Sequence, residues 1–254
     1  MDNAQELSAL NRSVPDRSIQ AHSGQALPGH PLSVQAQSVQ PRLVLATHNR
    51  HKVEELLAIL RSTDGLEDLA DDAVVSAADI GAPSPVEDGV SFEENALIKA
   101  RAAAAATGIP AVADDSGLCV DLMGGAPGIL SARWCGHHGD DQANLNLLLG
   151  QLGENLDPRQ RGASFACAAA LVTPDGTETT VRGEMRGVLI TEPHGGGGFG
   201  YDPIFVPEEQ PGTLTTSQME AADKNAISHR GKAFRALAPA IAEVISAEPQ
   251  ESSA

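Results

Sequence analysis

The spacing of apolar residues along this chain alternates between two periods, which predicts a protein of mixed strands and helices. Residues 43–47 form a short apolar run of the kind found in buried strands. After a polar stretch, apolar residues recur at helical spacing, at Val53, Leu56, Leu57 and Leu60. A strand, a polar loop and a helix in this order direct backbone N–H groups and a helix dipole towards an anion.

A second helix is predicted over residues 91–108. Ser91 and Glu94 have the spacing of a capping box, and the segment that follows is rich in alanine. Asn95 and Lys99 are four residues apart and therefore share one face of this helix. The carboxylate of Glu94 has two competing uses, as a cap or as a metal ligand, and the spacing alone favours the cap.

The second half of the chain predicts two further helices and a hairpin. Asp140 can cap a helix with a stripe of leucines. Residues 163–173 and 178–190 have the pattern of strands, and the Pro-Asp-Gly sequence between them is typical of a turn. An apolar stripe then predicts a C-terminal helix, in which Pro239 either produces a kink or starts a second segment.

The rest of the pattern sets the predicted boundaries. Residues 1–40 are rich in Ser, Gln, Pro and Ala without an apolar period, so we predict a disordered tail. Residues 41–247 are predicted to form a single domain, and residues 248–254 a frayed end. Residues 62–90 are acidic and loop-like. We interpret them as a solvated connection with one short strand at residues 73–76 and no part in chemistry.

Charge and cysteine content exclude several classes of protein. A formal net charge of −17 repels nucleic acid polymers and anionic membranes, so we expect neither as a partner. A phosphate ligand would need cations gathered locally, and the four lysines, Lys52, Lys99, Lys224 and Lys232, all lie in segments that stand out for other reasons. The three cysteines lack CxxC spacing, and neither a secretory signal nor a membrane-length apolar run is present. We therefore expect a cytoplasmic protein.

Two adjacent carboxylates, Asp114 and Asp115, follow a short apolar run and precede Ser116 and Gly117. We interpret this stretch as acids on a tight turn, close to the glycine-rich residues 124–128. Carboxylates together with phosphates are the ligands that Mg²⁺ takes in nucleotide enzymes. The stretch therefore predicts a metal ion held near a phosphate.

Two later loops carry groups suited to a nucleobase. Four glycines at residues 195–198 precede Phe199 and Tyr201, and the chain has few other aromatics. A base could stack on either ring, although an aromatic pair closing the core would have the same sequence. Residues 224–232 are rich in side chains that can donate hydrogen bonds to an anion or a base edge, and Arg230 can do so through two N–H groups.

These pieces predict attack of water on a nucleoside triphosphate, with a carboxylate as base and Mg²⁺ and lysines stabilising the phosphate charge. The chain contains neither a Walker A motif nor a GxGxxG motif. A P-loop NTPase and a dinucleotide-dependent oxidoreductase are therefore disfavoured.

Five segments stand in a fixed order: Thr47-His48-Asn49-Arg50-His51-Lys52; Phe92-Glu93-Glu94-Asn95-Ala96 with Lys99-Ala100; Ala113-Asp114-Asp115-Ser116-Gly117-Leu118 through Gly124-Gly125-Ala126-Pro127-Gly128 and Ser131-Ala132-Arg133; Gly198-Phe199-Gly200-Tyr201-Asp202-Pro203; and Ile227-Ser228-His229-Arg230-Gly231. Together they resemble the inosine triphosphatase family, also called the Ham1-like purine NTP pyrophosphatases, over residues 42–245.

The resemblance implies an elongated, two-lobed α/β fold. Helices would flank a long mixed central sheet, with a nucleotide cleft between the lobes, in a protein that is usually a homodimer. It also implies Mg²⁺-dependent hydrolysis of ITP, dITP and XTP to the nucleoside monophosphate and pyrophosphate. That reaction removes deaminated purines from the nucleotide pool.

The resemblance also implies a role for individual residues, according to their positions in the matching motifs. Asp115 would be the general base and a metal contact, Glu94 a metal ligand rather than only a cap, and Asp114 a support for the turn or for the outer shell of the metal. The residues implied to hold phosphates are Thr47, His48, Asn49, Arg50, His51 and Lys52. The residues implied to contact the rest of the nucleotide are Ser116, Phe199, Gly200, Tyr201 and Asp202, with Lys224, His229 and Arg230 reading the oxygen at purine C6.

Two other functions share many of these features. A non-catalytic nucleotide sensor on the same scaffold would not need the cluster of acids. A Maf-like pyrophosphatase for other modified nucleotides is disfavoured by the Ser228-His229-Arg230 segment. The exclusion of GTP must depend on groups around purine C2, which the sequence does not identify.

Overall fold

The computed structural model of this chain describes residues 41–47, 49–154 and 156–246. The predicted N-terminal tail and the predicted frayed end lie outside these ranges, as does His48. Within them, every helix is too short or too polar to cross a lipid bilayer.

One mixed sheet of six strands, in the order β2-β1-β3-β4-β5-β6, runs through the described domain. The strands are β1 (Leu43–Leu45), β2 (Val74–Ser76), β3 (Ala111–Val120), β4 (Gly162–Val172), β5 (Glu178–Leu189) and β6 (Phe205–Pro207). β1 is parallel to both β2 and β3, whereas β3 to β6 are antiparallel to one another. The predicted mixed sheet and the predicted hairpin of β4 and β5 are thus confirmed.

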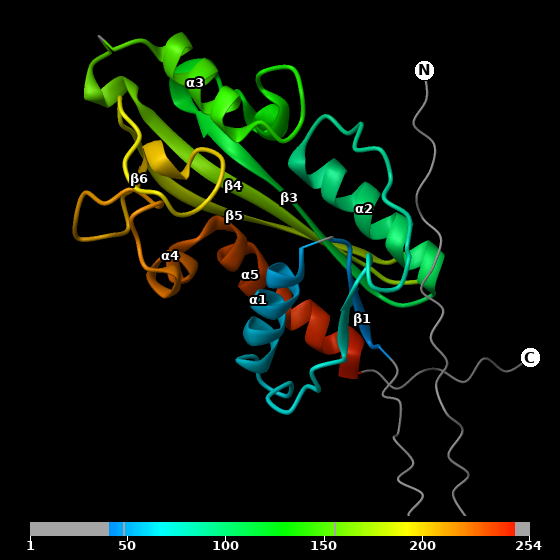
Figure 1. Cartoon of the computed structure of the whole chain (residues 1–254). Coiled ribbons are helices and arrows are strands. Elements are labelled where there is room, and N and C mark those ends of the chain that lie inside the picture. The colour runs from blue at the N-terminus through cyan, green and yellow to red at the C-terminus, as the bar shows by residue number, and fades with distance from the viewer. Residues whose placement is uncertain (1–40, 48, 155, 247–254) are drawn as a thin grey trace, which may run out of the picture. The chain divides into compact units, whose positions relative to one another are not determined.

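Helices cover both faces of this sheet (Figure 1). They are α1 (Arg50–Arg61), α2 (Phe92–Thr107), α3 (Asp141–Leu152), α4 (Ala221–Ile227) and α5 (His229–Ser246). The predicted caps are present, because the Ser91 side chain accepts from the Glu94 amide and the Asp140 side chain accepts from the Ala143 amide. α5 continues through Pro239 as one helix, so the alternative of a second segment starting there is wrong.

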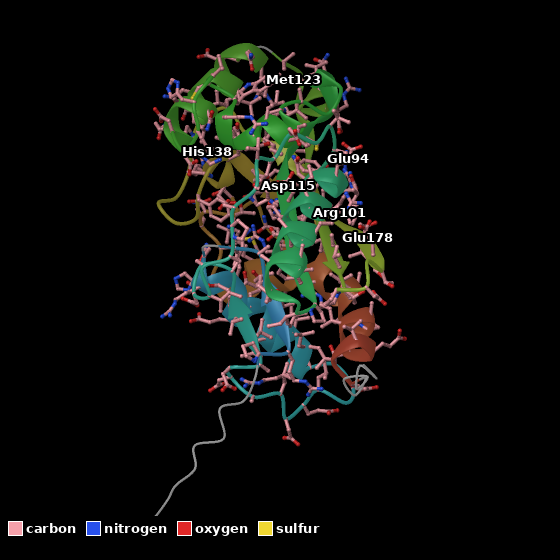
Figure 2. The ribbon with its side chains drawn as sticks, turned by 90° about the vertical axis from the view of Figure 1, so that its right-hand side faces the viewer. Glu94, Arg101, Asp115, Met123, His138 and Glu178 are labelled. Atoms are coloured by element: carbon pink, nitrogen blue, oxygen red, sulfur yellow. The ribbon has the colours of Figure 1, made fainter. Side chains whose placement is uncertain are left out.

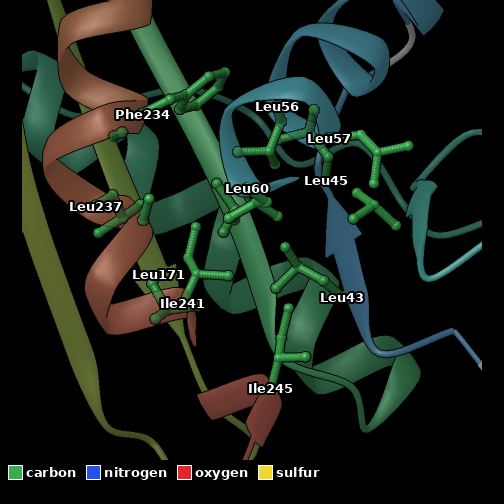
Figure 3. Close-up of a cluster of buried hydrophobic side chains, with 14 of the residues drawn as sticks. Leu43, Leu45, Leu56, Leu57, Leu60, Leu171, Phe234, Leu237, Ile241 and Ile245 are labelled. Atoms are coloured by element: carbon green, nitrogen blue, oxygen red, sulfur yellow. The ribbon is translucent and has the colours of Figure 1, made fainter. Parts of the chain in front are cut away.

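Alternation along the strands assigns side chains to the two faces. Leu43 and Leu45 of β1 pack with the leucines of α1 and with Phe234 and Leu237 of α5 (Figure 3). On the opposite face, Val44 packs with the alanines of α2 and β4. The leucines of α3 cover the far end of the first face, over Leu118 and Phe165. This face therefore carries two apolar clusters, one under α1 and α5 and one under α3.

The short length of β1 leaves part of the β3 edge without a strand neighbour on that side. β1 pairs with β3 only as far as Leu45 opposite Val112, whereas β3 continues to Val120 along β4. After β1 the chain turns away into α1. The carboxyl end of a parallel strand beside such a gap is where α/β sheets bind ligands.

Candidate active site

Asp114 and Asp115 lie in the middle of β3, opposite Ala169 and Ala168 of β4. The predicted tight turn is therefore wrong. Residues that look like turn formers are held in an extended strand by ten residues of continuous pairing with β4. Because neighbouring residues in a strand point to opposite faces, the two carboxylates enter different surroundings.

Gly117 is required by packing rather than by a turn. A Cβ atom there would lie 2.3 Å from the carbonyl oxygen of Gly128 and 2.5 Å from the hydroxyl oxygen of Ser131. These neighbours belong to η2 (Gly128–Arg133), a short helix that folds back onto β3. The Ser131 hydroxyl oxygen also accepts a hydrogen bond from the Leu118 amide at 2.9 Å. The glycine-rich segment thus returns Ser131 to the strand.

Asp115 faces α2, as Figure 2 shows with Asp115 beside this helix. Its carboxylate accepts a hydrogen bond from the Asn95 amide group at 3.1 Å and lies 3.6 Å from the Lys99 ammonium group. Lys99 also binds Glu87 at 3.1 Å. Burial raises the pKa of Asp115 above its ordinary value, against the lowering effect of Lys99 and Asn95. A carboxylate with a raised pKa is a stronger base.

Asp114 faces the opposite side, where it binds two cations. Both of its oxygens lie 2.8 Å from the Lys52 ammonium group, and one lies 3.1 Å from Nε of Arg230. Burial alone would raise the pKa of Asp114, but Lys52 and then Arg230 outweigh burial and hold the pKa well below its usual range. Asp114 is therefore ionised and fully engaged by protein groups, and it is not a free ligand.

A cavity of about 470 Å³ lies on the first face of the sheet, between its two apolar clusters. It collects eight of the predicted substrate-binding residues, namely Ser116, Phe199, Gly200, Tyr201, Asp202, Lys224, His229 and Arg230. Phe199 is 62% exposed, whereas Tyr201 is 4% exposed and its hydroxyl group donates a hydrogen bond to the Ser131 carbonyl at 2.9 Å. Of the two rings, Phe199 is therefore the one with a free face for a base. We call this space the base cavity.

Asp202 organises one wall of the base cavity. Its carboxylate accepts hydrogen bonds from the Lys224 ammonium group at 2.6 Å, the Phe199 amide at 2.9 Å and the Thr216 hydroxyl at 2.9 Å. The Lys224 ammonium group also lies 5.3 Å from the centre of the Phe199 ring. Asp202 is buried and has these partners already, so its contribution is to hold Lys224 and Phe199 in place.

His229 and Arg230 form the first turn of α5 and not the predicted loop. The Ser228 hydroxyl accepts from the Gly231 amide at 3.0 Å and thereby caps this helix. His229 stacks on Phe165 at 5.1 Å, and among the described residues its Nδ1 has no hydrogen-bond partner. Burial, followed by the charge of Arg230, lowers the pKa of His229 to about 3. A neutral imidazole with an unused nitrogen thus lines the base cavity.

Two smaller cavities, of about 320 and 200 Å³, adjoin the β3 edge. Lys52, Lys99, Glu87 and Asp114 line both, and Asp115 lines the larger one. We call the pair the charged cavities. Ser116 lines both the base cavity and the larger charged cavity. A ligand with an apolar ring and an anionic tail can therefore extend from one space into the other past Ser116 and Asp115.

The start of α1 contributes unevenly to these cavities. Thr47 and Lys52 line the smaller charged cavity. Asn49 caps α1, because its side chain accepts from the His51 amide at 3.0 Å. Arg50 and His51 are exposed and line none of the three cavities. The prediction for His48 concerns a residue outside the described ranges.

Glu94 takes the capping role that its spacing predicts. Its amide donates to the Ser91 hydroxyl at 3.1 Å, and its carboxylate accepts from the Val90 amide at 2.7 Å. Figure 2 shows Glu94 towards the beginning of α2, with Arg101 further along the same helix. Within the described ranges, no group of three or more Asp, Glu, His or Cys side chains is arranged to hold a metal ion by itself. The metal-ligand role of Glu94 stays a prediction.

The sequence model for the Ham1 family matches residues 43–240. This chain belongs to the Ham1 family. A protein of Streptomyces coelicolor named dITP/XTP pyrophosphatase is 57% identical over 204 residues, which covers 80% of this chain and 98% of the relative. A Bifidobacterium animalis protein with the same name is 49% identical, with 80% and 98% covered.

Solved Ham1 structures resemble the fold described above. A HAM1 protein from Coxiella burnetii superimposes with a TM-score of 0.70 at 36% identity, covering 80% of this chain and 100% of the other. A nucleoside-triphosphatase, or dITP/XTP pyrophosphatase, from Mycobacterium abscessus gives 0.63 at 46% identity, covering 78% and 98%.

Some residues that line the site of this Ham1-family chain were not among the catalytic, metal-binding and substrate-binding residues predicted from the sequence. Asn95 and Lys99 reach Asp115, and their four-residue spacing on one helix face was the available signal. Glu87 belongs to the segment interpreted as a solvated connection, and that interpretation is wrong for Pro83, Ser84, Pro85 and Glu87, which line the smaller charged cavity. The sequence around Glu87 gives no indication of this role, because Glu87 meets Lys99 only when the loop folds against α2.

Proposed function

We propose that this Ham1-family protein hydrolyses the deaminated purine nucleoside triphosphates ITP, dITP and XTP to the monophosphate and pyrophosphate. The observation that carries the proposal is the position of Asp115, a basic carboxylate that lines the larger charged cavity next to Ser116, the residue through which this cavity adjoins the base cavity. The relatives named dITP/XTP pyrophosphatase support the choice of substrate. Removal of deaminated purines from the nucleotide pool is the corresponding role.

The base cavity is suited to a purine with a carbonyl group at C6. Phe199 offers an exposed ring for stacking. The cations Lys224 and Arg230 supply donors, and neutral His229 supplies one donor and one acceptor nitrogen. Adenine would present an amine to these donors and leave them unpaired, which costs binding energy.

The reaction we propose begins with a water molecule beside Asp115. The carboxylate takes a proton from this water as it attacks the α-phosphorus atom, and the bond to the pyrophosphate oxygen breaks. Lys99, 3.6 Å from Asp115, and Lys52 stabilise the negative charge that develops on the phosphates. Thr47 and Arg133 also line the charged cavities and are placed to bind the tail.

The carboxylates around the larger charged cavity fit a divalent cation that binds together with the nucleotide. Mg²⁺ takes one or two protein carboxylates and completes its shell with phosphates and water, and Asp115 and Glu87 both line this cavity. We propose that these two residues hold Mg²⁺ together with Glu94, the metal ligand that the family resemblance implies. When bound, the cation neutralises charge on the phosphates.

We also propose a cytoplasmic homodimer. The outward face of β5 carries Arg182, Glu184 and Arg186, all exposed. A two-fold axis that passes between Arg182 and Glu184 would place each of these residues against the oppositely charged one in the second copy. Light scattering of the purified protein measures this directly, and a monomer mass at micromolar concentration would contradict it.

The decisive experiment compares ITP, XTP, dUTP, GTP and ATP in the presence of Mg²⁺ and separates pyrophosphate from phosphate among the products. We expect pyrophosphate, with ITP and XTP far ahead of the others. Asp115→Asn should keep nucleotide binding and lose about 10²- to 10⁴-fold in turnover, the usual contribution of a general base. Near-normal hydrolysis of ITP by this variant would exclude Asp115 as the base.

A further inference from the structure

Asp114 lies at the boundary between the two parts of the site. It lines both charged cavities, as does Lys52, but it does not line the base cavity. Arg230 lines the base cavity and neither of the charged ones. One carboxylate therefore binds a cation that belongs to the phosphate end and another that belongs to the base end.

The contacts are direct and buried. The Lys52 ammonium group lies 2.8 Å from each oxygen of Asp114, and Nε of Arg230 lies 3.1 Å from one of them. The Asp114 side chain is 2% exposed, and those of Lys52 and Arg230 are 22% and 14% exposed. Little water is available to screen these contacts, so a change at one cation is felt by the other.

The carboxylate oxygen that Arg230 binds is also a partner of Lys52. While both cations are present, they divide the charge of this carboxylate. Without Lys52, the whole charge would act on Arg230, draw its guanidinium group towards Asp114 and move it away from a bound base. A loss at the phosphate end should therefore weaken recognition at the base end.

We propose that Asp114 is a positioning residue that couples base recognition to phosphate binding by holding Lys52 and Arg230 on one carboxylate. This inference rests on the proposed function, since it assigns the base to one cavity and the phosphates to the others. It predicts that Lys52, which does not line the base cavity, affects discrimination between purines.

The test is the ratio of kcat/KM for ITP to kcat/KM for ATP. Both substrates carry the same triphosphate, so the direct effect of a lysine on phosphates cancels in this ratio, as does any loss of folded protein. Lys52→Met should lower the ratio by about three- to tenfold, the range expected when one hydrogen bond to the base is weakened.

Lys99→Met is the matched control. Lys99 lines the same two charged cavities, but its ion pairs within the described ranges are with Glu87 and Asp115. It should lower both kcat/KM values and leave their ratio unchanged. Asp114→Asn removes the shared charge, so Lys52→Met added to Asp114→Asn should produce no further change in the ratio.

The outcomes separate the two hypotheses. An unchanged ratio in Lys52→Met, or an equal change in Lys99→Met, would overturn the coupling while leaving the proposed function intact. A wild-type protein that releases no pyrophosphate from ITP would instead overturn the proposed function. If Asp114→Asn does not fold, the comparison of the two lysine variants still decides the coupling, because neither alters the buried carboxylate.

Discussion

Replacing Phe199 with alanine tests whether the base cavity binds a purine by stacking. Phe199 is 62% exposed, so less than half of this residue's surface is buried. Since complete burial of such a side chain contributes roughly 1.5–3 kcal/mol, the free energy of unfolding should fall by about 1 kcal/mol or less. Loss of a stacked base costs about 1–3 kcal/mol, which corresponds to about a 5- to 150-fold rise in KM for ITP.

Steady-state kinetics with ITP measures this effect, and a thermal unfolding curve on the same sample measures the stability. Phe199→Tyr is the matched control, because it keeps an aromatic ring at the same position and should keep KM within a factor of about two. Tyr201 is buried and cannot replace the lost ring. An unchanged KM in Phe199→Ala would refute base stacking at this residue.

Two further predictions concern the metal ion and the effect of pH. Glu87→Gln and Glu94→Gln should each raise the Mg²⁺ concentration for half-maximal activity by about 10- to 100-fold, as is typical for groups around a bound metal. An unchanged Mg²⁺ requirement in either variant, measured by Mg²⁺ titration, would exclude that residue as a ligand. The pKa of His229 is lowered from 6.5 to about 3 in the folded protein. Between these pH values the unfolded chain therefore binds a proton that the folded protein does not bind. The free energy of unfolding should for this reason fall as the pH drops below 6.5. Between pH 7 and 5 the wild type should lose about 2 kcal/mol more than His229→Asn in urea unfolding; parallel losses would show that His229 is protonated in the folded state.

Local signals predicted most of the secondary structure. Ser91 and Asp140 each place a side-chain oxygen where the first free amides of a helix need an acceptor. The Pro-Asp-Gly turn between β4 and β5 was equally readable, because its residues favour the required backbone angles whatever surrounds them. Features that depend on a few neighbouring residues were therefore accessible from the sequence.

Asp114 and Asp115 show where local reasoning fails. Asp-Asp-Ser-Gly has the composition of a turn, but pairing with β4 along ten residues keeps it extended. That pairing depends on a strand about fifty residues away, and it sends the two carboxylates to opposite faces. The choice of Asp115 over Asp114 came from the family resemblance, and only the fold explains why the two carboxylates differ.

The sequence by itself determined the inventory of this protein: most of the helices and strands, the few lysines in a strongly acidic chain, and the aromatic pair near residue 200. The tertiary structure decided which charges meet. Lys52 and Arg230 are separated from Asp114 by 62 and 116 residues, yet they share its carboxylate. Glu87 reaches Lys99 only when a loop folds back onto α2. Electrostatic energy depends on distance through space and on burial, and neither quantity is set until the sheet has formed.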